Sequence, residues 1–352
     1  MKILSQRLAA TFLAVSALGL SVQSYAAAAP KEIRISVSSA GEGGRPKIGG
    51  SFIASAHARG VLEQEFKKDG IKVTWLFFPG AGPATNEALA NGKVDFASQG
   101  DLPAIVGRAS GLKTKLLFST GRLSPVYFVV PSDSTAKTLA DLKGKKIANF
   151  KGTNGQIVLH RLLASQGLSE KDFRVINQDT YSSRTALATG DIDGTITTPW
   201  SLEARGVAKR LITSKDPLVS AVAAFWVTES FEKQYPEIVQ RVVTTLVKQA
   251  HWSTQEANRN EQYKLWSQSG IQYIDYKKDW DGTSLSARIN PLIDEFHISQ
   301  YTEAAAISKQ ARLIRRDVDI KNWYETKYLQ NALKDLQLEN YWQPLNAQGK
   351  SK

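Results

Sequence analysis

The chain has 352 residues, of which 42% are hydrophobic and 9% aromatic, a composition typical of a globular protein. Single hydrophobic cores stop growing at about 250–300 residues, so this length predicts two domains. The absence of cysteine excludes disulfides, thiolate metal sites and cysteine nucleophiles. Lys and Arg outnumber Asp and Glu by 45 to 33, a formal charge of +12. That excess permits an anionic partner, but it equally describes a solvated basic surface.

Residues 1–28 have the pattern of a secretory signal peptide. Lys2 and Arg7 give a positive start, residues 8–20 are almost wholly apolar, and small residues at 24–29 offer cleavage sites. The apolar run is too short for a transmembrane helix, which needs about 20 residues. We therefore expect a cleaved signal and a mature protein in the periplasm, where nucleic acid is not a partner.

The first part of the mature chain alternates short strands with helices. A glycine-rich loop over 40–50 follows the first strand, and the next helix begins at Ser51. Apolar periodicity predicts strands at 33–37, 71–77 and 94–97, and helices from 51 and around 86–90. This order is typical of an α/β protein with a largely parallel sheet.

The same alternation restarts after Gly121 and ends near Thr213. Its predicted elements are strands at 126–130 and 192–197, a helix, turn and strand within 139–148, and helices at 155–166 and 181–190. A buried strand at 221–228 then leads into a mostly helical region with a long amphipathic helix at 237–260.

Four motifs between residues 70 and 230 resemble those of periplasmic alkanesulfonate-binding proteins in order and spacing. They are GKVDFASQGDLP at 92–103, TLADLKGKKIA at 138–148, KGTN at 151–154 and ATGDID at 188–193. Binding proteins for taurine, nitrate and thiamine precursors are similar there. The chain departs from the pattern at 197–200, where it reads TTPW instead of a Trp-Asp-Pro-like turn.

The resemblance implies the two-lobe periplasmic-binding-protein fold of type II. In that fold each lobe is a mostly parallel sheet flanked by helices, and two crossover segments join the lobes. Residues 29–120 and 222–352 would form the first lobe, and residues 121–221 the second. The ligand would lie in the cleft between them.

The loop 41–51 contains the first candidate binding residues. Residues 44–51 match the phosphate-binding P-loop motif except that Gly50 occupies the position of the required lysine. The missing lysine argues against nucleotide hydrolysis. Backbone N–H groups at a helix start still favour an anion, so Gly44 and Ser51 are candidates. Arg45 could add a bidentate clamp. The alternative is a mobile surface loop with a solvated arginine.

Two further segments are candidates at predicted strand ends. Ser98 lacks the preceding glycine of a hydrolase elbow, since Phe96 stands there, so it is not expected to be a nucleophile. The resemblance instead places Gln99, Gly100 and Asp101 on the cleft; ordinary turn chemistry is the alternative.

Thr153, Asn154 and Gly155 precede an apolar helix, where N-cap residues and amides can present several donors to an oxyanion. A plain helix cap is the alternative interpretation. Arg122 lies just before a predicted crossover and could reach the cleft, although a surface position is equally compatible with the sequence.

Aromatic residues could cover the apolar part of a ligand. Thr198 and Trp200 belong to the atypical turn, and Trp226 lies in a predicted strand near the cleft; core packing is the alternative for both tryptophans. The four histidines, at 57, 160, 251 and 297, show no metal-ligand spacing.

The sequence thus predicts a solute-binding component of an ABC importer rather than an enzyme, with no cofactor and no metal. Its ligand would be an alkanesulfonate or a related organosulfur anion; a sulfate ester, taurine or nitrate remains open, and so does an enzyme of the same fold. The expected partners are the small anion and a membrane permease, and the protein is expected to be monomeric.

Overall fold

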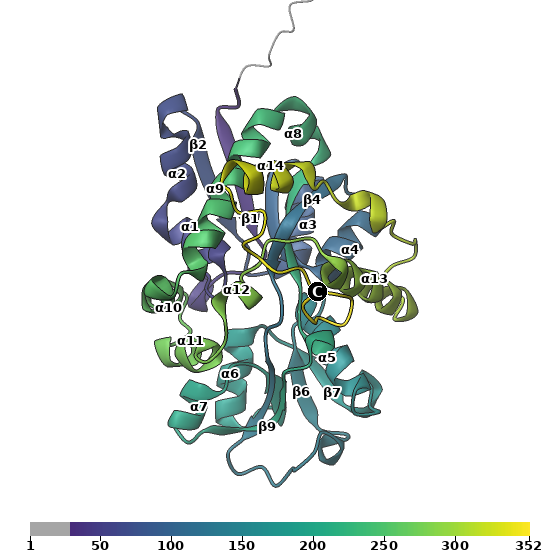
Figure 1. Cartoon of the computed structure of the whole chain (residues 1–352). Helices are drawn as coiled ribbons and strands as arrows, with labels where there is room; N and C mark the ends of the chain where they lie inside the picture. The colour runs from purple at the N-terminus through teal and green to yellow at the C-terminus, as the bar shows by residue number, and fades with distance from the viewer. Residues whose placement is uncertain (1–28) are drawn as a thin grey trace, which may run out of the picture.

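The computed structural model describes residues 29–352, so the signal peptide predicted at 1–28 lies outside the described residues. The described chain forms two α/β lobes, one above the other in Figure 1, each built on a five-stranded sheet. The predicted fold class is confirmed. In the part of the chain that is described, no helix is both long enough and apolar enough to cross a bilayer.

The sheet of the first lobe has the strand order β2-β1-β3-β10-β4. β1 pairs in parallel with β2 and β3, whereas β10 runs antiparallel to both β3 and β4. The strand bounds are β1 Glu32–Val37, β2 Lys72–Phe77, β3 Phe96–Gly100, β4 Thr114–Gly121 and β10 Ala223–Thr228.

The sheet of the second lobe repeats this plan with the order β7-β6-β8-β5-β9. β6 pairs in parallel with β7 and β8, and β5 runs antiparallel to β8 and β9. The strand bounds are β5 Val126–Pro131, β6 Lys146–Asn149, β7 Arg174–Asn177, β8 Gly194–Ile196 and β9 Ala208–Ser214. In each sheet the antiparallel strand is the one that directly follows a crossing between the sheets.

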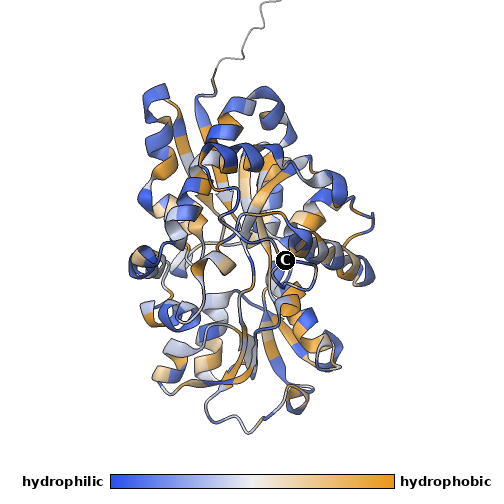
Figure 2. Ribbon diagram, in the orientation of Figure 1, coloured by the Kyte–Doolittle hydropathy of each residue, from blue (hydrophilic) through white to orange (hydrophobic). Residues whose placement is uncertain are grey.

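Helices cover both faces of the first sheet, and their apolar sides face it (Figure 2). One face carries α1 Phe52–Arg59, α2 Val61–Phe66, α8 Glu229–Gln234, α9 Pro236–Thr254, α10 Arg259–Ser267, α11 Tyr273–Trp280, α12 Leu285–Arg288 and α14 Lys327–Asp335. The other face carries α3 Ala81–Ala90, α4 Asp101–Ala109 and α13 Glu295–Gln310. On the second sheet, α5 Asn154–Ala164 covers one face, and α6 Thr180–Thr189 and α7 Trp200–Ala204 cover the other.

Alternating strand residues explain these two-sided cores. Phe96 faces one side of the first sheet and Ala97 the other, because successive side chains of a strand point to opposite faces. Phe96, Phe118 and Phe225 stack across three neighbouring strands, with ring centroids 5.6 and 5.1 Å apart. This aromatic row joins β3 to β4, which precedes the first crossing, and to β10, which follows the second.

The chain crosses between the sheets twice, after β4 ends at Gly121 and before β10 begins at Ala223. All strands of the first sheet come from residues before 122 or after 222, and all strands of the second from residues between these limits. This distribution supports the predicted lobe boundaries, which we keep as a proposal. We call the two units lobe 1 and lobe 2 below.

Two helix boundaries differ from the sequence prediction. The helix that begins at Phe52 is interrupted at Gly60, which has φ 62° and accepts the left-handed conformation that ends α1. The long amphipathic helix ends at Thr254 rather than continuing to residue 260, because Gln255 is extended.

His297, on α13, is expected to make the protein less stable in acid. The side chain is fully buried, and burial together with the nearby Arg122 lowers its pKa to about 3. The unfolded chain has the ordinary histidine pKa of about 6.5, so below that pH it takes up a proton that the folded protein does not. The contribution of His297 to the free energy of unfolding is therefore constant above about pH 7. Below pH 6.5 this contribution falls by about 1.4 kcal/mol per pH unit.

Urea unfolding of the wild type and His297→Phe at pH 7.5 and 5.5 measures this contribution. The wild type should lose about 1.4 kcal/mol more than the variant between the two pH values. Other groups cancel in the comparison, including Asp101, whose pKa burial raises to about 6. Tyr301→Phe serves as the control and should keep the wild-type slope, because burial raises the pKa of Tyr301 well above its ordinary value. Equal slopes for wild type and His297→Phe would contradict the assignment.

Candidate functional site

A cavity of about 640 Å³ lies between the two lobes, at the edges where their parallel strands end. The ends of β1, β3 and β4 contribute from lobe 1, and the segments after β6, β7 and β8 contribute from lobe 2. The beginning of β10 also lines it. Polar lining residues from the two lobes include Ser38, Ser39, Ser51, Gln99, Thr120, Asn149, Thr153, Asn154, Gln178, Asp179, Tyr181 and Ser182.

The glycine-rich loop after β1 forms one wall of this cavity. It is held in place by backbone hydrogen bonds, from Gly41 N to Arg45 O and from Glu42 N to Ser269 O. A Cβ on Gly49 would lie 2.0 Å from the hydroxyl of Tyr276, so only glycine permits this close approach to α11. Ser51 caps α1, its hydroxyl accepting from Ala54 N at 3.2 Å. The loop is therefore packed against α11 and the segment before it, within lobe 1.

The opposite wall begins at the N-terminus of α5. Thr153 caps this helix, its hydroxyl accepting from Gly155 N at 3.2 Å and donating to Phe150 O at 2.7 Å. The cap is neutral, so the partial positive charge of the helix end is not cancelled by a carboxylate. Asn149, which is 8% exposed, lies in the same wall and its amide nitrogen has no hydrogen-bond partner among the described residues. These groups offer donors to an anion.

The two lobes approach each other closely at Gly100, the residue that precedes α4. A Cβ on Gly100 would lie 2.5 Å from Cβ of Asn154 in lobe 2, a contact that side-chain rotation cannot relieve. Gln99 lies beside it, within 3.4 Å of the Ser38 hydroxyl and 3.5 Å of Asn86. The tip of β3 thus meets the start of α5 at the cavity.

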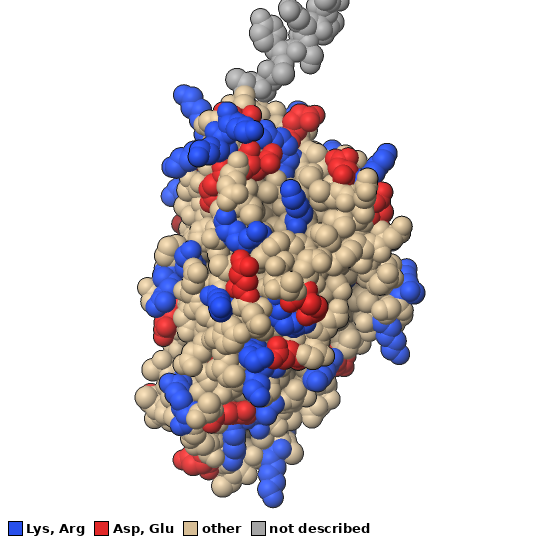
Figure 3. Space-filling model, turned by 60° about the vertical axis from the view of Figure 1, so that its left-hand side comes forward, with Lys and Arg blue, Asp and Glu red and all other residues tan. Residues whose placement is uncertain are grey.

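The cavity lining carries little charge despite the basic composition. Within the described lining there is no lysine or arginine, and its one carboxylate belongs to Asp179. On the face in Figure 3, basic and acidic side chains are interspersed rather than gathered round a single hollow. An anion in this cavity would therefore be held by amides, hydroxyls and helix N-termini rather than by a cationic side chain.

Seven of the residues predicted from the sequence line the cavity, and their role in binding remains a prediction. They are Gly44, Ser51, Gln99, Gly100, Thr153, Asn154 and Gly155.

Arg45, Asp101 and Arg122 do not line the cavity, which corrects the expectation for these three. The half-exposed side chain of Arg45 turns back on its own loop and donates to Glu42 O at 2.9 Å. Asp101 is buried below the cavity near Arg161. Arg122 is buried in an ion pair with Asp294, at 2.5 Å, that anchors the first crossing to lobe 1.

Thr198, Trp200 and Trp226 also lie outside the cavity. The Thr198 carbonyl and hydroxyl accept from Arg184 at 2.6 and 3.2 Å. Trp200 packs against Tyr127 and beneath the guanidinium of Arg210, 4.2 Å from its ring. Trp226 is 1% exposed in the lobe 1 core beside Trp323. Core packing, the alternative for the two tryptophans, is what the structure shows.

The sequence prediction missed the wall formed by the start of α6. Gln178, Asp179, Tyr181 and Ser182 all line the cavity. Asp179 caps α6, and the signal for it was an aspartate immediately before a predicted helix. Only the position of β7 beside β6 shows that this cap faces the same cavity as Thr153.

Arg161 of α5 joins lobe 2 to lobe 1 behind the cavity. It is 5% exposed, and its guanidinium donates to Ser220 O, Gln300 O and Glu303, at 3.0 to 3.1 Å. Its Nη1 also lies 3.8 Å from Oδ2 of Asp101, the first residue of α4. The helix whose N-terminus faces the cavity is thereby attached at its other end to α13 and to the second crossing.

A second set of contacts joins the lobes through α11. Asp275, fully buried, accepts from Ser201 N at 3.0 Å and lies 3.3 Å from the guanidinium of Arg184. One turn later Asp279 accepts from the hydroxyl of Tyr127 at 2.9 Å. Both acceptors lie on α11, whereas all three donors belong to lobe 2.

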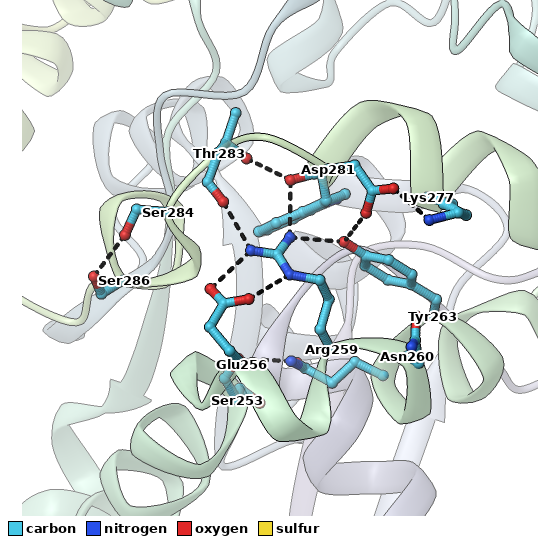
Figure 4. Close-up of polar contacts among 12 residues, drawn as sticks. Ser253, Glu256, Arg259, Asn260, Tyr263, Lys277, Asp281, Thr283, Ser284 and Ser286 are labelled. Carbon is cyan, nitrogen blue, oxygen red and sulfur yellow. Dashed lines mark hydrogen bonds and ion pairs between the residues drawn. The ribbon is translucent and has the colours of Figure 1, made fainter.

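α11 is fixed to α10 by the network around Arg259 (Figure 4). The guanidinium of Arg259, on α10, donates to Trp280 O of α11 at 2.9 Å and also contacts Glu256, Tyr263 and Thr283, with hydrogen bonds of 2.6 to 2.9 Å. Lys277 of α11 contacts Asp281 at 2.5 Å in the same corner. These contacts at the C-terminal end of α11 hold the helix in place against α10, with Asp275 and Asp279 directed to lobe 2.

Comparison with known proteins agrees with this architecture. Residues 63–258, more than half of the chain, match the family described as NMT1/THI5 like. The chain belongs to the NMT1/THI5-like family. The matched segment contains all of lobe 2 and both crossings, whereas the glycine-rich loop and α11 lie outside it.

Relatives of this NMT1/THI5-like protein carry binding-protein names. A Bacillus subtilis protein named as an aliphatic sulfonates-binding protein is 27% identical over 80% of this chain and 84% of its own length. A solved structure from Methylobacillus flagellatus, described as a periplasmic sulfonate-binding protein of an ABC transporter, is 34% identical with a TM-score of 0.77. It covers 90% of this chain and 98% of the solved chain.

Two further structures mark the range of the fold. The alkanesulfonate-binding protein SsuA of Xanthomonas axonopodis, solved bound to MOPS, is 26% identical with a TM-score of 0.68, over 85% of this chain and 100% of its own. The desulfurization enzyme DSZB is 18% identical with a TM-score of 0.62, over 87% and 100%, which shows a shared fold alone.

Gly100→Ala is expected to destabilise this NMT1/THI5-like protein by holding the lobes apart. The added methyl group would lie 2.5 Å from Cβ of Asn154, and overpacking of this kind costs about 1–3 kcal/mol. Gly121→Ala is the matched control, since a Cβ there meets nothing within 4 Å and should change stability by less than about 0.5 kcal/mol. Urea unfolding measures both. Equal stability of the two variants would show that the lobes do not meet at Gly100.

Proposed function

We propose that the protein is the periplasmic solute-binding component of an ABC import system and captures an alkanesulfonate or a related organosulfur anion between its lobes. The observation that carries the proposal is the interlobe cavity lined by the neutral N-terminus of α5, the Asn149 amide and several hydroxyls. The sulfonate-binding names of the relatives support the same ligand class.

The chemistry of a sulfonate matches these donors. A sulfonate has three oxygens that share one negative charge, and each can accept more than one N–H or O–H group. Helix N-termini and amides can hold such a group without a buried counter-charge. Closure of the lobes around it would exclude water and strengthen these hydrogen bonds, because the local dielectric falls.

Transport would follow from that closure. Lobes held together by ligand present a surface that differs from that of the open protein, and a membrane permease can recognise the difference. The contacts of Arg161 and α11 are the groups of the described chain that would form as the lobes close. The proposed action is capture and delivery of the anion by a monomer in the periplasm, with no change to the ligand's covalent bonds.

Binding to sulfonates tests the proposal directly. Isothermal titration with propane-1-sulfonate should give saturable binding, and the ligand at 100 times its Kd should raise the unfolding free energy by about 2.7 kcal/mol. Glucose and tetramethylammonium serve as neutral and cationic controls and should not bind. Binding of these controls in place of the sulfonate would contradict an anion-binding function.

The position of the anion can be tested with charge alone. Gly155 lies in the first turn of α5 and lines the cavity. Gly155→Asp places a carboxylate there, and Gly155→Asn places an uncharged group of the same size. We expect propane-1-sulfonate to bind at least about 10-fold more weakly to the aspartate variant than to the asparagine variant, because like charges repel. Equal affinities would place the anion elsewhere.

A further inference from the structure

Tyr181 connects the lobe 2 side of the cavity to lobe 1. It lies at the start of α6 and lines the cavity, and its hydroxyl donates to Ser269 O, between α10 and α11, at 3.1 Å. Among the described lining residues, only Tyr181 and Ser124, which belongs to the first crossing, have a side-chain hydrogen bond to the other lobe. The Tyr181 contact lies outside both crossings, so it forms only when the lobes are close together.

The acceptor of this hydrogen bond is held in place by the glycine-rich loop. Glu42 N donates to the same oxygen of Ser269 at 2.7 Å, and a carbonyl oxygen has lone pairs for both donors. A Cβ on Gly41 would lie 2.6 Å from Ser269 O, and a Cβ on Gly270, which has φ 106°, would lie 2.5 Å from Cβ of Glu42. Glycine at both positions allows the two backbone segments to approach, and their contact fixes the carbonyl that Tyr181 meets.

A second contact fixes the side of α6 that faces lobe 1. Arg184 lies three residues after Tyr181 and therefore on the same side of the helix. Its guanidinium lies 3.3 Å from the fully buried carboxylate of Asp275 on α11, the helix above α6 in Figure 1. Burial raises the pKa of Tyr181, so its hydroxyl keeps its proton at neutral pH and remains a donor.

We propose that Tyr181 is a latch, whose hydrogen bond to Ser269 O favours the closed arrangement of the lobes in the ligand-free protein and slows release of a bound ligand. The part about release rests on the proposed function. An alkanesulfonate has no hydrogen-bond donor, and the one hydroxyl proton of Tyr181 goes to Ser269 O. The hydroxyl therefore acts on the lobes rather than on the ligand, which makes Tyr181 a positioning residue.

Distances between the lobes test the latch without any ligand. The chain has no cysteine, so Ala188→Cys on α6 and Glu261→Cys on α10, both exposed positions, provide one spin-label site in each lobe. Double electron–electron resonance then reports the open and closed populations. Tyr181→Phe keeps the ring and removes the hydroxyl. It should raise the ratio of open to closed protein by about 2- to 10-fold, as expected for the loss of one neutral hydrogen bond.

Tyr273→Phe is the matched control. The hydroxyl of Tyr273 donates to Asn260 at 3.0 Å within lobe 1, and Tyr273 does not line the cavity. This variant should keep the distances of the labelled parent. If Tyr181→Phe also keeps them, the inference is overturned.

Release of propane-1-sulfonate, followed by stopped-flow fluorescence, links the latch to binding. Tyr181→Phe should release it about 2- to 10-fold faster than the wild type, and Tyr273→Phe at the wild-type rate. Equal rates for Tyr181→Phe and the wild type would overturn this inference and leave the proposed function intact. If propane-1-sulfonate binds none of the three proteins, the proposed function fails, and the distances between the lobes still decide whether Tyr181 is a latch.

Discussion

The site depends on how closely the two lobes approach each other across the cavity. Each lobe contributes only part of the cavity lining, and the chain crosses between the lobes at just two places in its described part. The close approach at Gly100 and Asn154 brings the end of β3 against the start of α5. Arg161 and Asp275 join the lobes on either side of this point. α5 carries both the proposed anion-binding groups and Arg161, which joins the lobes, so the proposed binding would be coupled to closure of the lobes.

The net charge of the protein is strongly positive, whereas the lining of its cavity contains no positively charged side chain among the described residues. The chain carries a net charge of +12, but among the described residues its lysines and arginines lie outside the cavity lining. Two guanidinium groups near the junction of the lobes are already paired, Arg122 at the first crossing with Asp294 and Arg184 of α6 with Asp275 of α11. In the proposed function neutral donors would meet the ligand, while the paired arginines stabilise the arrangement of the lobes. A site without a cationic side chain avoids an unpaired positive charge when the cavity is empty.

Local signals in the sequence predicted the fold class and the part of the site built from backbone. Strand alternation, the glycine-rich loop and the capping residue Thr153 are readable over a few neighbouring residues, and the structure places the last two on the cavity. Side-chain roles that depend on distant partners were not readable. Arg122 seemed free to reach a ligand, because its partner Asp294 lies 172 residues away. Trp226 likewise packs on Trp323, which belongs to the C-terminal region.

The central claim is that neutral donors at the start of α5 hold a sulfonate between the lobes. A crystal structure of the complex with propane-1-sulfonate tests it most directly. The account predicts sulfonate oxygens at hydrogen-bond distance, about 2.7–3.2 Å, from the amides that follow Thr153 and from the Asn149 side chain. It also predicts no lysine or arginine in contact with them. A sulfonate held by an arginine side chain, or bound outside the interlobe cavity, would contradict the account.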